Sequence, residues 1–154
     1  MSTLIIGIGN TLRGDDGAGH QAALLLADVL VGDDVDVVAC HQLTLEMSEP
    51  LARATTVVFI DAEYGGAAGE IRLRSLAPAD ADLFTHVLTP ETLLSAALAL
   101  YGRAPEAWLY TICGEDFGYK EGLSLAVRVA VNEVAQRVTQ FCRAAMPNRQ
   151  LSGA

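Results

Sequence analysis

The sequence has few basic residues and no long hydrophobic run. Lys and Arg number 10 against 19 Asp and Glu, which gives a formal net charge of −9 at pH 7. This balance argues against nucleic-acid and anionic-membrane partners, because their phosphate groups would be repelled. No apolar run reaches the ~18 residues that span a bilayer, and the chain enters an apolar segment without a basic leader. We therefore expect a cytoplasmic protein.

Cysteines and the common nucleophile motifs are also scarce. Cys40, Cys113 and Cys142 are isolated, without a Cys-x-x-Cys pair, and are expected to be small buried thiols in a reducing compartment. The sequence contains no Gly-x-Ser-x-Gly, Ser-x-x-Lys or His-Glu-x-x-His motif, which argues against the nucleophile and zinc systems that use them. Cys113 precedes a glycine at the end of an apolar run, but no basic residue lies nearby to activate it.

The most informative motif is Gly-Asp-Asp-Gly at positions 14–17, shortly after the apolar run 4–9. The spacing from Gly9 to Gly14 matches a phosphate-binding P-loop, but Asp15 and Asp16 replace the expected Lys and Ser or Thr. Two carboxylates would repel a polyphosphate. They suit a cation instead, and the N-terminus of the following helix helps to keep them ionised.

The remaining pattern predicts one α/β domain over residues 1–146 and a flexible tail over 147–154. Apolar strands are expected over 4–9, 35–40, 56–60 and 107–113, and the alternation in 70–74 predicts an antiparallel edge strand. Helices are expected over 15–26, 44–52, 90–101 and about 121–143, the third with Thr89 as its N-cap. The fold class is a three-layer sandwich with a mostly parallel five-stranded sheet and one antiparallel edge strand.

Several polar residues follow the predicted strands. Asp16 follows the first, Gln42 the second and Asp61 the third, and ligands bind at the carboxyl ends of the strands in such sheets. Taken singly, Asp16 and Asp61 fit a helix start and a turn, and His86 fits a loop. Together they offer two carboxylates and an imidazole for a divalent metal, and these ligand types leave zinc, nickel, iron and manganese open. His20, about one turn beyond Asp16, is a weaker candidate.

The ordered set of motifs resembles the nickel–iron hydrogenase maturation endopeptidases over residues 3–140. The matching segments are 7–10, 14–17, the strand ending in Asp61, the loop containing His86, 114–117 and 121–124. The segment His41–Glu46 looks like the branch that serves soluble NAD-reducing hydrogenases.

The resemblance implies that Asp16, Asp61 and His86 are the catalytic and metal-contacting residues, and we assign Gln42 and Thr44 to substrate binding. It further implies cleavage of a C-terminal extension from the hydrogenase large-subunit precursor after nickel insertion, with the nickel supplied by the precursor. The chemistry agrees, because three ligands without a closed fourth position form a poor permanent cage but a suitable docking point. The alternative is a non-catalytic, metal-responsive protein that docks on a metalloenzyme precursor.

Overall fold

The computed structural model describes residues 2–32, 34–79 and 88–152, and the side chains of its last helix up to residue 144. Its centre is a five-stranded sheet in the order β2-β1-β3-β5-β4. The strands are β1 (Thr3–Ile8), β2 (Val35–Cys40), β3 (Thr56–Glu63), β4 (Ile71–Leu76) and β5 (Glu106–Cys113). Four strands are parallel, and β4 runs antiparallel to β5 at one edge. The predicted sheet is confirmed, including its antiparallel edge strand.

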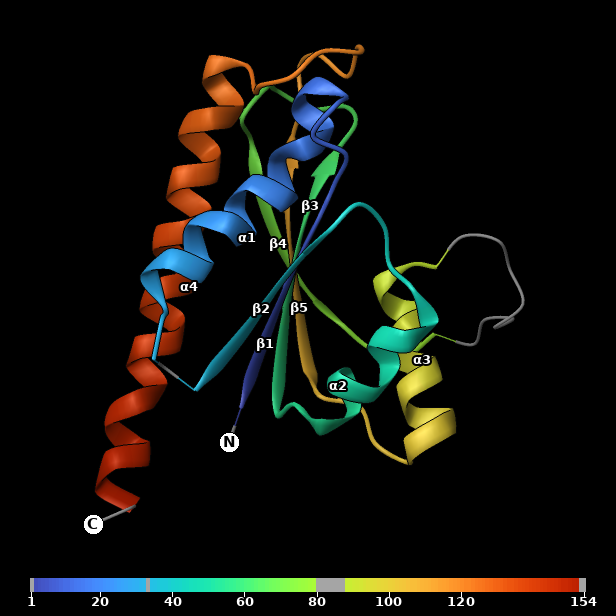
Figure 1. Cartoon of the computed structure of the whole chain (residues 1–154), viewed down its shortest axis with the longest axis vertical. Coiled ribbons are helices and arrows are strands. Elements are labelled where there is room, and N and C mark those ends of the chain that lie inside the picture. Colours follow the sequence, from blue (N-terminus) through green and yellow to red (C-terminus); the bar gives the residue numbers. More distant parts are fainter. Residues whose placement is uncertain (1, 33, 80–87, 153–154) are drawn as a thin grey trace.

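Helices cover both faces of the sheet (Figure 1). The helices α1 (Ala18–Val29) and α4 (Leu125–Ser152) lie on one face, and α2 (Ser48–Arg53) and α3 (Pro90–Tyr101) lie on the other. Alternate side chains of each strand point to opposite faces, so Ile5 packs toward α1 and α4 while Leu4 and Ile6 pack toward α2 and α3. The predicted three-layer sandwich is confirmed.

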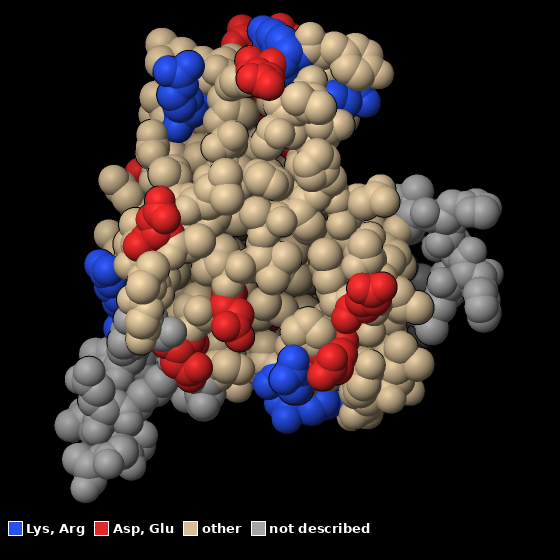
Figure 2. Space-filling model, viewed as in Figure 1, with Lys and Arg blue, Asp and Glu red and all other residues tan. Residues whose placement is uncertain are grey.

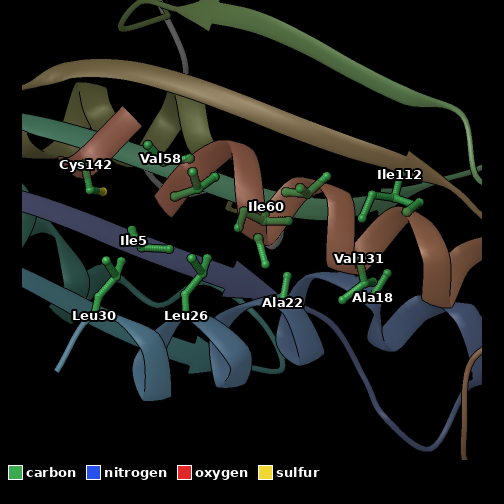
Figure 3. Close-up of a cluster of buried hydrophobic side chains, with 14 of the residues drawn as sticks. Ile5, Ala18, Ala22, Leu26, Leu30, Val58, Ile60, Ile112, Val131 and Cys142 are labelled. Carbon is green, nitrogen blue, oxygen red and sulfur yellow. The ribbon is translucent and has the colours of Figure 1, made fainter. Parts of the chain in front are cut away.

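The layer between the sheet and the α1–α4 pair forms a continuous apolar core (Figure 3). Ile5, Val58 and Ile60 supply it from the sheet, and Leu26 and Val131 meet them from α1 and α4. All five side chains are almost completely buried. Fully burying one aliphatic side chain stabilises the fold by about 1.5–3 kcal/mol, so this face anchors the strands whose ends carry the polar residues.

Two glycines let α1 begin unusually close to the sheet. A Cβ on Gly7 of β1 would collide with the carbonyl oxygen of Gly19, and a Cβ on Gly19 would collide with the carbonyl oxygens of Ile8 and Ile60. The start of α1 is thereby pressed against the carboxyl ends of β1 and β3. This contact brings the Gly-Asp-Asp-Gly motif to the end of β3.

The N-terminus of α3 forms as predicted. The Thr89 side chain accepts a hydrogen bond from the backbone N–H of Thr92, and the Thr92 hydroxyl accepts one from the backbone N–H of Thr89. Pro90 occupies the first turn, and Gly102 ends the helix with φ 77°. The reciprocal bonds pair two N–H groups that a helix leaves unsatisfied.

Several predicted boundaries were wrong. Gly14–Gly17 forms a 3-10 turn, η1, before α1, and Leu45–Met47 forms another, η2, before α2. The strand β3 continues past Asp61 to Glu63, because β5 pairs with it as far as Cys113.

The last helix, α4, begins at Leu125 rather than near 121 and continues to Ser152. The flexible tail over 147–154 stays a prediction. No helix within the described ranges is long and apolar enough to cross a membrane.

Candidate functional site

The chain changes the direction in which it adds strands to the sheet between β1 and β3. The chain leaves β1 through α1 to reach β2 on one side, and then returns through α2 on the opposite face to reach β3 on the other side of β1. The two connections diverge at this point and leave a crevice at the carboxyl ends of the two strands, which is where α/β sheets bind ligands. Asp16 and Asp61 both lie here.

A cavity of about 320 Å³ occupies this crevice. Asp16 reaches it from η1, Asp61 from β3, and His41 and Gln42 from the segment after β2. The complete lining is Ile8, Gly9, Asp16, His41, Gln42, Leu43, Asp61, Leu88, Thr89 and Pro90. Segments from four parts of the sequence therefore converge on one cavity, which Asp16, Gln42 and Asp61 line together with several apolar side chains.

Asp16 is held by the loop that follows β1. Its Oδ2 accepts a hydrogen bond of 2.9 Å from the backbone N–H of Asn10, and Asn10 Oδ1 in turn accepts the N–H of Leu12 at 3.0 Å. The described part of the chain offers no hydrogen-bond donor to Oδ1 of Asp16. One carboxylate oxygen is thus fixed by the protein while the other remains available to a ligand.

Asp61 is less easily ionised than an ordinary aspartate. Burial is the main cause that raises its pKa to about 6, and the negative charges of Asp16 and Glu63 raise it further. The backbone N–H of Ala62 donates to Oδ1 at 2.8 Å and opposes the shift. A buried carboxylate with a raised pKa, next to a second carboxylate, is typical of a site that binds a cation or transfers a proton.

Asp15 has a different role from Asp16, which corrects the prediction that both carboxylates serve a cation. It is 1% exposed, and Oδ2 accepts the backbone N–H groups of Glu115 at 2.8 Å and Asp116 at 3.0 Å. Ser124 donates its backbone N–H to Oδ1 at 2.7 Å and its hydroxyl to Oδ2 at 2.9 Å. Burial opposes ionisation, but the backbone bonds outweigh it and lower the pKa of Asp15. Asp15 therefore clamps the loop 114–124 against η1.

Sequence reasoning missed this clamp, although the sequence carries a signal for it. Segments 14–17 and 114–124 both contain motifs that resemble the endopeptidase family, and the structure shows the two segments hydrogen-bonded to each other. Gly14 adds to the contact, because its φ is 55° and a Cβ there would collide with the carbonyl oxygen of Asp116. Cys113, just before this loop, is completely buried with a pKa raised chiefly by burial, so it is poorly suited to act as a nucleophile.

The histidines near the cavity pair with each other. The rings of His20 and His41 meet edge to face with their centroids 5.8 Å apart. Burial, followed by the neighbouring His41, lowers the pKa of His20, and its buried Nδ1 has no hydrogen-bond partner among the described residues. His20 thus packs against the cavity-lining His41 but is not itself a lining residue.

The described part of the chain contains no group of three or more His, Cys, Asp or Glu side chains arranged to hold a metal ion. His86, the third predicted ligand, lies outside the described residues. Leu88, two positions further along the chain, lines the cavity. Of the two predicted substrate-binding residues, Gln42 lines the cavity, whereas Thr44 is exposed at the start of η2 and is not among the lining residues.

No protein-family model matches this sequence, and no curated protein matches it. Solved structures do match. The NiFe hydrogenase maturation protease HycI from Thermococcus kodakarensis KOD1 has a TM-score of 0.76 at 24% identity, with 92% of each chain covered. The hydrogenase maturating endopeptidase HybD from E. coli has a TM-score of 0.75 at 22% identity, with 94% of each chain covered.

A third match is the hydrogenase 2 maturation peptidase from Thaumarchaeota archaeon SCGC_AB-539-E09. It has a TM-score of 0.69 at 23% identity and covers 92% of this chain and 97% of its own. The three structures come from bacterial and archaeal sources and are covered almost end to end. The chain therefore has the fold of these hydrogenase maturation proteases.

Proposed function

We propose that this protein is an endopeptidase that removes the C-terminal extension of a nickel–iron hydrogenase large-subunit precursor in the cytoplasm, after nickel insertion. The observation that carries the proposal is the meeting of Asp16 and Asp61 in one cavity at the switch point of the sheet. The fold shared with solved hydrogenase maturation proteases supports the same function.

The donor set fits a metal that arrives with the substrate. Asp16 offers one oxygen without a hydrogen-bond donor among the described residues, and Asp61, with a pKa of about 6, is ionised at neutral pH and can act as a ligand. Two carboxylates alone are too few to close a coordination sphere around nickel. We propose His86 as the third contact, because it precedes the cavity-lining Leu88 by two residues. The precursor's own ligands complete the sphere.

Asp61 can also serve the hydrolysis itself. A carboxylate with a pKa of about 6 is ionised at pH 7 and can accept a proton from an attacking water more readily than an ordinary aspartate. Nickel brought by the precursor to the same point would supply Lewis acidity toward the water or the scissile carbonyl. The residues of this chain would hold the precursor's metal and orient the peptide beside it.

The precursor is proposed to belong to a soluble NAD-reducing hydrogenase. The support is the segment His41–Glu46, whose first three residues line the cavity where the substrate would lie. Gln42 presents an amide that can bond to a peptide backbone, and Thr44, exposed beyond the cavity, would contact the precursor outside the cleavage point.

The test is incubation of the protein with nickel-loaded and nickel-free precursor, with release of the C-terminal peptide read as a loss of mass. We expect cleavage of the nickel-loaded form only. Asp16→Asn and Asp61→Asn should abolish release, whereas Asp36→Asn, an exposed aspartate on β2, should leave it unchanged. A precursor from a membrane-bound hydrogenase, offered in parallel, tests the proposed branch.

Three outcomes would contradict parts of this proposal. Tight binding of the nickel-loaded precursor without peptide release would favour a docking protein that does not cut. Equal cleavage with and without nickel would remove the metal from recognition. Cleavage by both aspartate variants at the wild-type rate would show that the chemistry lies elsewhere in the protein.

A further inference from the structure

The loops beside the cavity expose apolar and aromatic side chains that do not contribute to the core. Tyr119 is 89% exposed, Tyr64 67% and Leu12 54%. Tyr64 stacks on Phe117 with the ring centroids 4.0 Å apart, and Arg13 lies over the Tyr119 ring at 5.3 Å. We call these five residues the rim: Leu12, Arg13, Tyr64, Phe117 and Tyr119.

Arg13 contributes a positive charge to the rim. No acidic side chain within the described ranges forms an ion pair with its guanidinium, although the chain as a whole carries a net charge of −9. The guanidinium instead lies over the exposed Tyr119 ring, which leaves its N–H groups available to an anion from a partner. Tyr and Arg, with Trp, are the residue types enriched among those that dominate protein–protein affinity once a partner covers them.

The rim is held in place rather than loosely attached. The backbone N–H of Gly14 donates to the carbonyl oxygen of Lys120 at 2.9 Å, and the N–H of Lys120 donates to that of Leu12 at 3.1 Å. The buried carboxylate of Asp15 fixes the same loop through its bonds to 115, 116 and 124. A fixed surface loses little conformational entropy when a partner binds.

The rim is continuous with the candidate site. Leu12 and Arg13 follow the cavity-lining Gly9 in the loop after β1, and Tyr64 follows Asp61 by three residues at the end of β3. Both loops lie at the upper end of Figure 1, where charged side chains of both signs gather in Figure 2. A protein whose chain entered the cavity would cover this surface.

We propose that the rim docks the folded body of the substrate protein, which presents an acidic side chain to Arg13 and apolar side chains to Tyr119, Tyr64 and Leu12. The inference rests on the proposed function and names the surface outside the cleavage cavity that recognises the precursor. Two regions then have separate roles. The cavity binds the metal and the scissile peptide, and the rim supplies affinity for the body of the precursor.

The test measures KM and kcat for precursor cleavage, together with the Kd for the precursor over a range of salt concentrations. Arg13→Ala and Tyr119→Ala should each raise KM and Kd about tenfold, which corresponds to ~1.4 kcal/mol, with kcat within twofold of wild type. Arg13→Ala should also flatten the salt dependence of Kd, because a charge pair is lost. Tyr119→Phe, which keeps the ring, should restore most of the affinity.

Matched controls come from the opposite end of the molecule. Tyr101, 50% exposed at the end of α3, and Arg103 lie away from the candidate site, so Tyr101→Ala and Arg103→Ala should change neither KM nor Kd. Unchanged thermal midpoints in all four alanine variants would show that the rim effects are not due to unfolding.

Two results would overturn the docking role while leaving the proposed function intact: rim variants that bind precursor as tightly as wild type, or a loss confined to kcat. A wild-type protein that neither binds nor cuts the precursor would overturn both proposals.

Discussion

Replacing Asp61 by Asn is expected to stabilise the protein while abolishing precursor cleavage. Burial, with the charges of Asp16 and Glu63, raises the pKa of Asp61 from 3.8 to about 6. Each pKa unit corresponds to about 1.36 kcal/mol, so the ionised carboxylate lowers the free energy of unfolding by about 3 kcal/mol at neutral pH. Asparagine has nearly the same shape without the charge. Because the amide is still partly buried, we expect a gain of about 1–3 kcal/mol.

The stability gain of Asp61→Asn should increase as the pH rises. Between pH 4 and 6 the folded protein holds a proton on Asp61 that the unfolded chain has released, so the wild type loses stability as the pH rises through this range. Above pH 6 the full advantage of Asp61→Asn is present. At pH 4.5 about 1 kcal/mol of it should remain, and below pH 4 it should vanish.

Thermal unfolding at pH 4.5 and 7.5 measures this effect. For a chain of this length 1 kcal/mol shifts the midpoint by about 2–4 °C, so Asp61→Asn should unfold roughly 3–10 °C above wild type at pH 7.5 and much closer to it at pH 4.5. Asp36→Asn, exposed on β2, is the control and should change little. A lower midpoint for Asp61→Asn would make Asp61 a structural residue, and a gain that is equal at both pH values would show that the pKa of Asp61 is not raised; either result would refute the reasoning.

Three further predictions concern the clamp, the packing of α1 and the pH profile. Asp15→Ala leaves three buried N–H groups without their acceptor, so it should lower the free energy of unfolding by about 3 kcal/mol or more; a change under 1 kcal/mol in urea unfolding would contradict the clamp. Gly19→Ala should cost more than about 2 kcal/mol, because the new Cβ meets the carbonyl oxygens of Ile8 and Ile60; a midpoint equal to wild type would show that α1 can move away. Cleavage activity should fall as the pH drops through about 6, where Asp61 becomes protonated; a rate that is flat from pH 5 to 8 would exclude Asp61 as a ligand or base.

Local sequence patterns were sufficient to predict most of the elements. The run 35–40 gives β2 with the predicted bounds, and the alternation in 70–74 correctly indicated the antiparallel edge strand β4. Thr89, Pro90 and Gly102 marked the limits of α3. These features depend on side-chain periodicity and on caps within a few residues of each other, so they can be read without knowing the remainder of the fold.

The boundaries that failed depend on contacts that are distant in sequence. The strand β3 extends to Glu63 because β5, some fifty residues later, pairs with it. The helix α4 begins at Leu125 because Ser124 donates two hydrogen bonds to Asp15 across the molecule. Periodicity alone extended the helix over residues that this clamp holds in a loop.

The candidate site shows the same division. The sequence by itself determined that Asp16 and Asp61 follow parallel strands and so lie at one edge of the sheet. Only the tertiary structure decided which acid of the Asp15–Asp16 pair faces the cavity. In a 3-10 turn, neighbouring side chains point about 120° apart, so two adjacent aspartates face different surroundings. Asp15 meets the N–H groups of a loop about one hundred residues away, while Asp16 meets Asp61 across the cavity. Identical residues acquire different roles because their environments are supplied by distant parts of the chain.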